Sequence, residues 1–152
     1  CLFAKNIIMA TCLLHLHNLL RWIILILLFV AIYQAFTKNK GVQKISLFLL
    51  ISAHITLLLG LYQYFFGEKG IALFKAYGSE VMKNPSLRFW AVEHITGMII
   101  AIVLITIARG KAKTENYNAL KWLYLVALII ILAVVPWPFR AGIGRPWFPG
   151  MG

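Results

Sequence analysis

Histidine is the residue type most able to carry chemistry in this chain. The sequence has four histidines, and all of them lie inside long apolar segments: His15, His17, His54 and His94. An ionisable ring at membrane depth is costly, so such residues mark functional sites by default. Histidine is also a common axial ligand of haem iron. The pattern therefore indicates a membrane protein that binds haem b.

Helical geometry narrows the set of ligands. His15 and His17 are two residues apart and point to opposite sides of a helix, so only one faces the bundle interior. We expect that one to be His17, because Arg21 lies one turn further on its face. At about 1.5 Å per residue, His94 lies within one turn of the depth of His17 or of His54, which are themselves about two turns apart. We predict that His94 ligates iron with either His54 or His17. The unused histidine would hydrogen-bond a propionate, or bind a quinone head group or a proton.

Charged residues at membrane depth form a second candidate group. Arg21 lies about 13 Å along its span if the helix begins near Cys12, and Glu93 lies at a similar depth in the third span. We predict an Arg21–Glu93 contact or a shared network, since a carboxylate at that depth either protonates or finds a cation. A haem propionate is the alternative anion for Arg21, and snorkelling to the lipid head groups is a third interpretation. Arg140 is assigned to the same network.

Other cofactors find less support in the sequence. Gly97 lies one turn after His94, where it either leaves room for a flat macrocycle or lets two helices pack closely. The two cysteines, Cys1 and Cys12, are not in a C-x-x-C-H motif, which argues against c-type haem, an iron–sulfur cluster and zinc. No group of carboxylates accompanies the histidines, which disfavours a non-haem metal. The catalytic motifs of hydrolases and nucleotide-binding enzymes are also absent.

The segments that position these residues are apolar and long. The chain of 152 residues is 62% hydrophobic, with a mean hydropathy of +0.86. Each of the four apolar runs is long enough to cross a hydrocarbon core of about 30 Å. The predicted fold is therefore one all-α integral membrane domain, a four-helix bundle. Its expected spans are about 13–36, 45–66, 87–108 and 119–135, followed by an irregular tail at 136–152.

Local signals refine these boundaries. Leu73, Tyr77 and Val81 recur every four residues, which predicts a short amphipathic helix in the membrane interface. Asn84 followed by Pro85 is typical of a helix N-cap, so the third span should begin there. The tail after the fourth span is rich in proline, glycine and aromatics, and should lie on the outer surface or on a partner.

Charge indicates a membrane surface as the partner of this chain. The net charge of +11 resides mostly at the ends of spans, where it meets lipid head groups, so nucleic-acid binding is not expected. Basic residues are denser in the loops 37–44 and 109–121, which favours those loops on the cytoplasmic side and both termini on the periplasmic side. Met9 is the expected start, with residues 1–8 as an upstream extension.

Three motifs resemble those of a known group of proteins. They are His15-Leu16-His17-Asn18-Leu19-Leu20-Arg21-Trp22, Phe89-Trp90-Ala91-Val92-Glu93-His94 and Pro136-Trp137-Pro138-Phe139-Arg140. From about Leu14 onward, the chain resembles small four-span membrane proteins of Bacteroidota-like bacteria that are labelled cytochrome b. The resemblance implies a protein of the bacterial plasma membrane that is an accessory of a respiratory complex.

Three functions are consistent with these observations. The first is an electron-transfer subunit with one haem b on two histidines, linked to quinol and to other subunits of a membrane complex or to further copies of itself. The second is a structural accessory subunit without a cofactor. The third is a small transporter or proton-conducting protein, which is disfavoured because there is no sign of inverted repeats.

Overall fold

The computed structural model describes the backbone of residues 2–148 and the side chains from Met9 to Phe148. No strand occurs in this range, and four helical stretches are long and apolar enough to cross a membrane. The all-α, four-span prediction is therefore confirmed. The elements are α1 (Leu2–Phe36), α2 (Val42–Phe66), α3 (Ile71–Tyr77), α4 (Glu80–Lys83), α5 (Pro85–Arg88), the π-helical turn η1 (Phe89–Glu93), α6 (His94–Lys113) and α7 (Tyr117–Val134).

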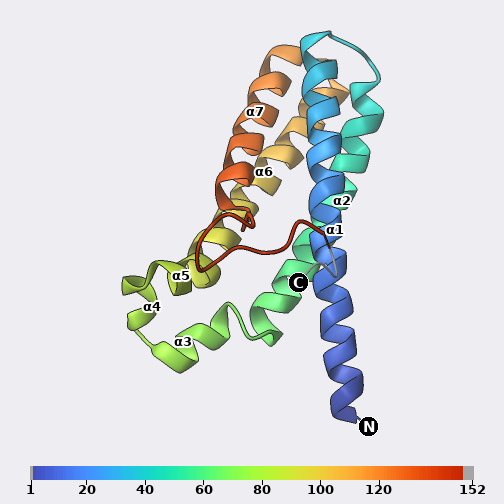
Figure 1. Cartoon of the computed structure of the whole chain (residues 1–152). Helices are drawn as coiled ribbons and strands as arrows, with labels where there is room; N and C mark the ends of the chain where they lie inside the picture. The colour runs from blue at the N-terminus through green and yellow to red at the C-terminus, as the bar shows by residue number, and fades with distance from the viewer. Residues whose placement is uncertain (1, 149–152) are drawn as a thin grey trace.

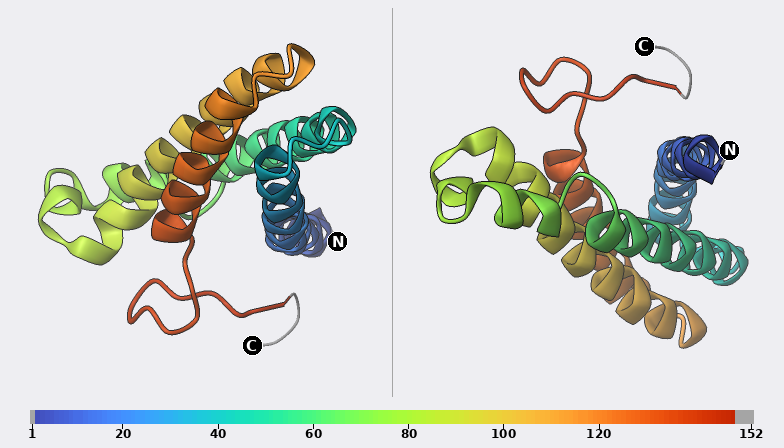
Figure 2. Two further views of the ribbon diagram at one scale, coloured as in Figure 1. Left: turned by 90° about the horizontal axis from the view of Figure 1, so that it is seen from above. Right: turned by 90° about the horizontal axis from the view of Figure 1, so that it is seen from below.

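The four long helices form a bundle (Figure 1). Packing runs from α1 to α2, from α2 to α6, from α6 to α7 and from α7 back to α1, so α1 and α6 lie diagonally across the bundle. The α1–α2 and α6–α7 connections lie at one end, which we call the loop end. The start of α1, the helices α3, α4 and α5 and the C-terminal segment up to Phe148 lie at the other, which we call the terminal end (Figures 1 and 2). This is the arrangement expected for spans that alternate in direction.

The centre of the bundle combines small side chains with large apolar ones such as Leu28, Ile105 and Tyr124, and further large apolar side chains face outward. Alanine is frequent among the buried core residues, and small residues let membrane helices approach closely. Many large apolar side chains are exposed on the outside, including Leu58 (68%) and Ile129 (64%). A surface of this kind suits contact with lipid. The buried alanines are Ala31, Ala35, Ala53, Ala91, Ala101, Ala108, Ala112 and Ala127.

At the loop end, α6 is longer than the sequence predicted. The third span was expected to end at Ala108, but α6 continues to Lys113. Arg109 lies inside the helix, where its Nη1 donates to the carbonyl of Gln43 (2.9 Å) and to Oγ of Ser46 (3.1 Å). Ser46 is fully buried. These hydrogen bonds join α6 to α2 and hold the last turns of α6 against the bundle.

The segment between α2 and η1 differs from the single interfacial helix that was expected. Gly78, with φ of +54°, ends α3 and begins a turn into α4, because glycine adopts this backbone conformation without strain. The apolar stripe is divided as a result. Val81 is buried, while Tyr77 is 54% exposed. Two short helices therefore replace one.

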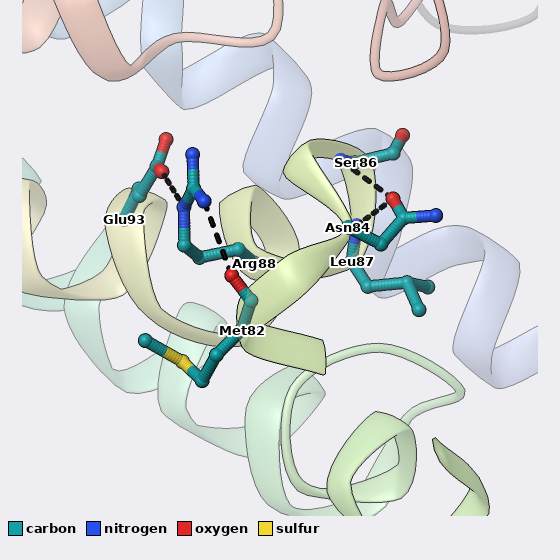
Figure 3. A network of polar contacts seen from close by, with 6 residues as sticks. All are labelled: Met82, Asn84, Ser86, Leu87, Arg88 and Glu93. Carbon is teal, nitrogen blue, oxygen red and sulfur yellow. Dashed lines mark hydrogen bonds and ion pairs between the residues drawn. The ribbon is translucent and has the colours of Figure 1, made fainter. Parts of the chain in front are cut away.

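The predicted N-cap is confirmed. Oδ1 of Asn84 accepts hydrogen bonds from the backbone N–H groups of Ser86 (2.9 Å) and Leu87 (3.2 Å), as Figure 3 shows. Pro85 occupies the first helical position, where its missing N–H has no consequence. The cap fixes the start of a continuous helical path through α5 and η1 into α6, and so sets the register of His94.

Removal of this cap should destabilise the protein measurably. Asn84→Ala leaves two N–H groups without their acceptor, and we expect the free energy of unfolding to fall by about 1 kcal/mol. Ser79→Ala is the matched control, because Ser79 precedes α4 without a side-chain cap hydrogen bond. Unfolding in mixed detergent micelles measures both variants. Equal effects of the two changes would contradict the assigned role of Asn84.

Candidate functional site: a histidine pair across the bundle

Two of the candidate histidines meet inside the bundle near its terminal end. His17 comes from α1 and His94 from the first turn of α6, so the pair spans the diagonal of the bundle. Their ring centroids are 6.4 Å apart, and the ring planes are inclined by 66°. Both side chains are largely shielded from the surface. The structure thus brings together one of the two pairs that the sequence left open.

His94 is held in one tautomer by the end of α7. Its Nδ1 lies 2.7 Å from the carbonyl oxygen of Val134, the last residue of α7. A carbonyl oxygen only accepts, so Nδ1 must donate and carry the proton. In the neutral ring, Nε2 then keeps its lone pair. Orientation of a ligand histidine through a carbonyl is the usual arrangement at metal centres.

His17 has an unsatisfied nitrogen. Its Nδ1 is buried and has no hydrogen-bond partner within the described chain. Gly60 of α2 lies against the ring, and a Cβ added at Gly60 would lie 3.3 Å from Cε1 of His17. The absence of a side chain at Gly60 therefore leaves room for the imidazole ring of His17. A buried polar atom without a partner is costly unless a ligand or water completes it.

His54 is not part of this pair. Its side chain is exposed on the outside of α2, and its Nδ1 lies 2.9 Å from the carbonyl oxygen of Leu50 in the same helix. Its assignment as a possible ligand with His94 is therefore corrected. The depth of His54 in the membrane is compatible with a pair with His94. The side chain of His54, however, points away from the bundle interior.

Gly97 serves helix packing. A Cβ at Gly97 would lie 2.6 Å from Cγ1 of Val134 and 3.0 Å from its Cγ2. The space beside this glycine is filled by α7, so the interpretation that Gly97 leaves room for a macrocycle is wrong. The close approach has another consequence. It brings the carbonyl of Val134 to His94.

The predicted contact between Arg21 and Glu93 is also wrong. Nε of Arg88 donates to Oε1 of Glu93 at 2.7 Å, and Nη1 of Arg88 donates to the carbonyl of Met82 at 3.1 Å (Figure 3). Arg88 and Glu93 are five residues apart, and they are brought together around the π-helical turn η1. Both side chains are partly exposed, at 38% and 41%. Glu93 is thus paired locally at the surface of the bundle.

Arg21 binds the C-terminal strap, which we define as residues 136–148. Its Nη2 donates to the carbonyls of Trp147 (2.9 Å) and Pro146 (3.3 Å). Nε1 of Trp22 donates to the same Trp147 carbonyl at 2.8 Å, and the two indoles stack. Nδ2 of Asn18 donates to Pro146 at 3.4 Å. The prediction that the tail is irregular is confirmed for the strap, which packs against α1, while residues 149–152 lie outside the described chain.

Some polar atoms in this region keep no partner. Oδ1 of Asn18 and Nε of Arg21 are buried and unpaired within the described chain, like Nδ1 of His17. These three residues follow one another along α1 within a little more than one turn. The terminal end of α1 therefore presents unsatisfied acceptors and a cationic donor toward the interior.

Arg140 does not join Arg21 or Glu93. Its Nη1 donates to the carbonyls of Ala133 (2.9 Å) and Val135 (3.3 Å), and its guanidinium lies over the ring of Phe89. Carbonyls at the end of a helix lack partners within that helix. Arg140 therefore caps α7, and its assignment to a shared charge network is corrected.

A substitution of Arg21 tests whether its partner is the strap, as in the structure, or Glu93, as the sequence suggested. Arg21→Gln should increase hydrogen–deuterium exchange in the strap by about tenfold or more, because a hydrogen bond to a charged donor contributes about 1.5–3 kcal/mol. Glu93→Gln is the matched control, since it removes the partner that the sequence suggested. If Glu93→Gln loosens the strap as much as Arg21→Gln does, the assignment of Arg21 to the strap is wrong.

The distance between the two ring centroids matches that of two imidazoles on one metal ion. A nitrogen ligand lies about 2.0–2.1 Å from a metal, and the ring centroid lies about 1.1 Å behind it, so two opposed imidazoles have centroids about 6.3 Å apart. Each ring can turn about its metal–nitrogen bond, so an interplanar angle of 66° is compatible with this arrangement. Among residues 9–148 there is no group of three or more His, Cys, Asp or Glu side chains able to hold a metal. Two histidines suffice only where another group supplies the remaining ligands.

The fold and the site define a class: a four-span helical membrane protein with a histidine pair across its bundle. Comparison with known proteins adds nothing to this class, because the chain matches no protein-family model, no curated protein and no solved structure. The resemblance to proteins labelled cytochrome b therefore stays a prediction.

Proposed function

We propose that the protein is a membrane electron-transfer subunit that holds one haem b between His17 and His94. The observation that carries this proposal is the spacing of 6.4 Å between the two rings, which come from diagonally placed helices. Haem suits a site with only two protein ligands, because the macrocycle provides the other four. A non-haem metal would need further side chains, and the described residues offer none nearby.

The chain's own residues prepare the pair for this role. The carbonyl of Val134 keeps the proton of His94 on Nδ1 and so leaves Nε2 as the ligand atom. His17 has no competing hydrogen bond at Nδ1. Phe89 and Trp90 pack against His94, with centroids 5.9 and 6.0 Å away, and exclude water from it. When bound, haem b would supply a one-electron ferric–ferrous couple.

Cationic side chains near the site would raise the reduction potential of such a couple. Nζ of Lys69 lies 4.8 Å from the ring centre of Trp90, and the guanidinium of Arg145 lies 5.1 Å from it. Positive charge stabilises the form of a cofactor that has gained an electron. We further propose that the protein belongs to a quinol-linked complex of a bacterial plasma membrane, with its termini on the periplasmic side.

The first experiment measures haem in the purified full chain. The protein is produced with haem supplied, purified in neutral detergent, and examined by reduced-minus-oxidised absorption and by haem content per chain. We expect the α-band of haem b and about one haem per chain. A folded protein without an α-band would contradict the proposal and favour a cofactor-free structural subunit.

A further inference from the structure

A groove on the lipid-facing side of the bundle runs between α6 and α7 near the loop end. Its volume is about 400 Å³. The wall from α6 includes Leu104, Ile107 and Lys111, and the wall from α7 includes Ala119, Trp122 and Val126. The lining is entirely apolar, so Lys111 lines the groove with its alkyl chain and not with its ammonium group.

The spacing of the lining residues gives the groove a direction. On each helix they recur at three or four residues, so each set occupies one helical face. Lys111 and Ala119 flank the α6–α7 connection, whereas Leu104 and Val126 lie seven residues further into the bundle. Seven residues correspond to about 10 Å, which lies within one leaflet of a hydrocarbon core about 30 Å thick. The groove thus runs from the membrane surface toward the centre of the bilayer, in the direction of a lipid acyl chain.

The entrance of the groove is positively charged. Lys111 is exposed and forms no ion pair within the described chain, where the ion pairs are Lys40–Glu115, Lys83–Glu80 and Arg88–Glu93. The single acidic residue of the α6–α7 connection, Glu115, is bound by Lys40 at 3.3 Å. A lysine at the end of a span extends its ammonium group to the head-group level. Trp122, which is 63% exposed, adds an indole of the kind that favours this level.

We propose that this groove binds one acyl chain of an anionic phospholipid whose phosphate contacts Lys111. The apolar lining matches the chain, and the unpaired ammonium group matches the phosphate. A zwitterionic lipid has the same acyl chain but no net negative charge, so its head group would be attracted less strongly to Lys111. This site is independent of the histidine pair, which lies at the opposite end of the bundle.

Native mass spectrometry of the delipidated full chain in neutral detergent tests the proposal, with phosphatidylglycerol and phosphatidylcholine as probes. We expect the wild type to bind phosphatidylglycerol about fivefold more tightly, the preference that one basic residue near a membrane confers. Lys111→Gln should abolish this preference. Lys113→Gln, which changes the same charge on another face of α6, should preserve it. Ala119→Phe should weaken both lipids by filling the groove.

Three results would overturn the proposal. One is equal binding of the two lipids by the wild type, and another is an equal loss of preference in the Lys111 and Lys113 variants. The third is a dimer that excludes lipid and dissociates in Ala119→Phe, since the groove would then be occupied by a second copy of the chain. Circular dichroism of each variant confirms that the helices are intact.

Discussion

Replacement of His94 with alanine is expected to abolish binding of the proposed haem b. The change deletes one of the two proposed axial ligands, and loss of even an outer partner of a metal ligand lowers affinity by about 10–100-fold. We expect the haem content of the purified protein to fall at least tenfold. His17→Ala should have the same effect, because the proposal gives both histidines the same role and their ring centroids lie 6.4 Å apart.

His54→Ala is the control for these two variants. It removes a histidine from the same membrane domain, but one that lies on the outside of α2 and is bonded to its own helix. We expect full haem content and an unchanged α-band. Loss of haem in the His54 variant, with retention in the His17 variant, would reverse the ligand assignment.

Replacement of Gly97 is expected to have the largest effect on stability. The Cβ of Gly97→Ala would lie 2.6 Å from Cγ1 of Val134, and the side chain of valine cannot easily rotate away because it is branched at Cβ. Gly97→Leu adds more volume at the same place. Overpacking of this kind lowers the free energy of unfolding by about 1–3 kcal/mol, and unfolding in mixed micelles measures it.

Another glycine of the same helix provides the control. A Cβ at Gly110 would meet nothing within 4 Å, so Gly110→Ala should stabilise α6 by about 0.5–1 kcal/mol. Val134→Ala, combined with Gly97→Ala, should recover part of the loss because it makes room for the new methyl group. If the Gly97 and Gly110 variants are equally stable, the close packing of α6 and α7 is not as described.

The fold follows from the sequence to a large extent because its strongest signals are local. The structure contains the four apolar helices, the Asn84–Pro85 cap and the end of α7 before the proline, as the sequence predicted. Each of these features depends on residues that are close together in the chain. The end of α6 was misplaced by one turn. A partly buried arginine such as Arg109 resembles a loop residue in the sequence, because its partners on α2 are not evident there.

The site was predicted less completely than the fold. Its geometry depends on the side of the helix from which each histidine projects, as well as on the depth of the histidine in the membrane. Depth alone could not choose between His17 and His54, which differ in the side of the helix that they occupy. The π-helical turn η1 changes the helical phase next to Glu93, and no feature of the sequence indicated it. The role of the Val134 carbonyl also depends on how closely α7 approaches α6 at Gly97.

One missed group did leave a signal. Carbonyls at the end of α7 lack partners within the helix, because Pro136 stops it. Arg140 follows this end closely in the sequence, so a search for nearby donors would have identified it. His94 also bonds to this end, but it lies 40 residues away on another helix. The contact of Arg21 with the strap left no such signal, since it is made with backbone carbonyls about 125 residues away.

We proposed that His17 and His94 would together hold one haem b. Electron paramagnetic resonance of the oxidised, haem-loaded wild-type protein tests it most directly. Two nitrogen ligands on the axial positions predict a low-spin ferric signal, which should become high-spin or disappear in His17→Ala and in His94→Ala. A high-spin signal in the wild type, or a low-spin signal that survives both substitutions, would contradict the claim.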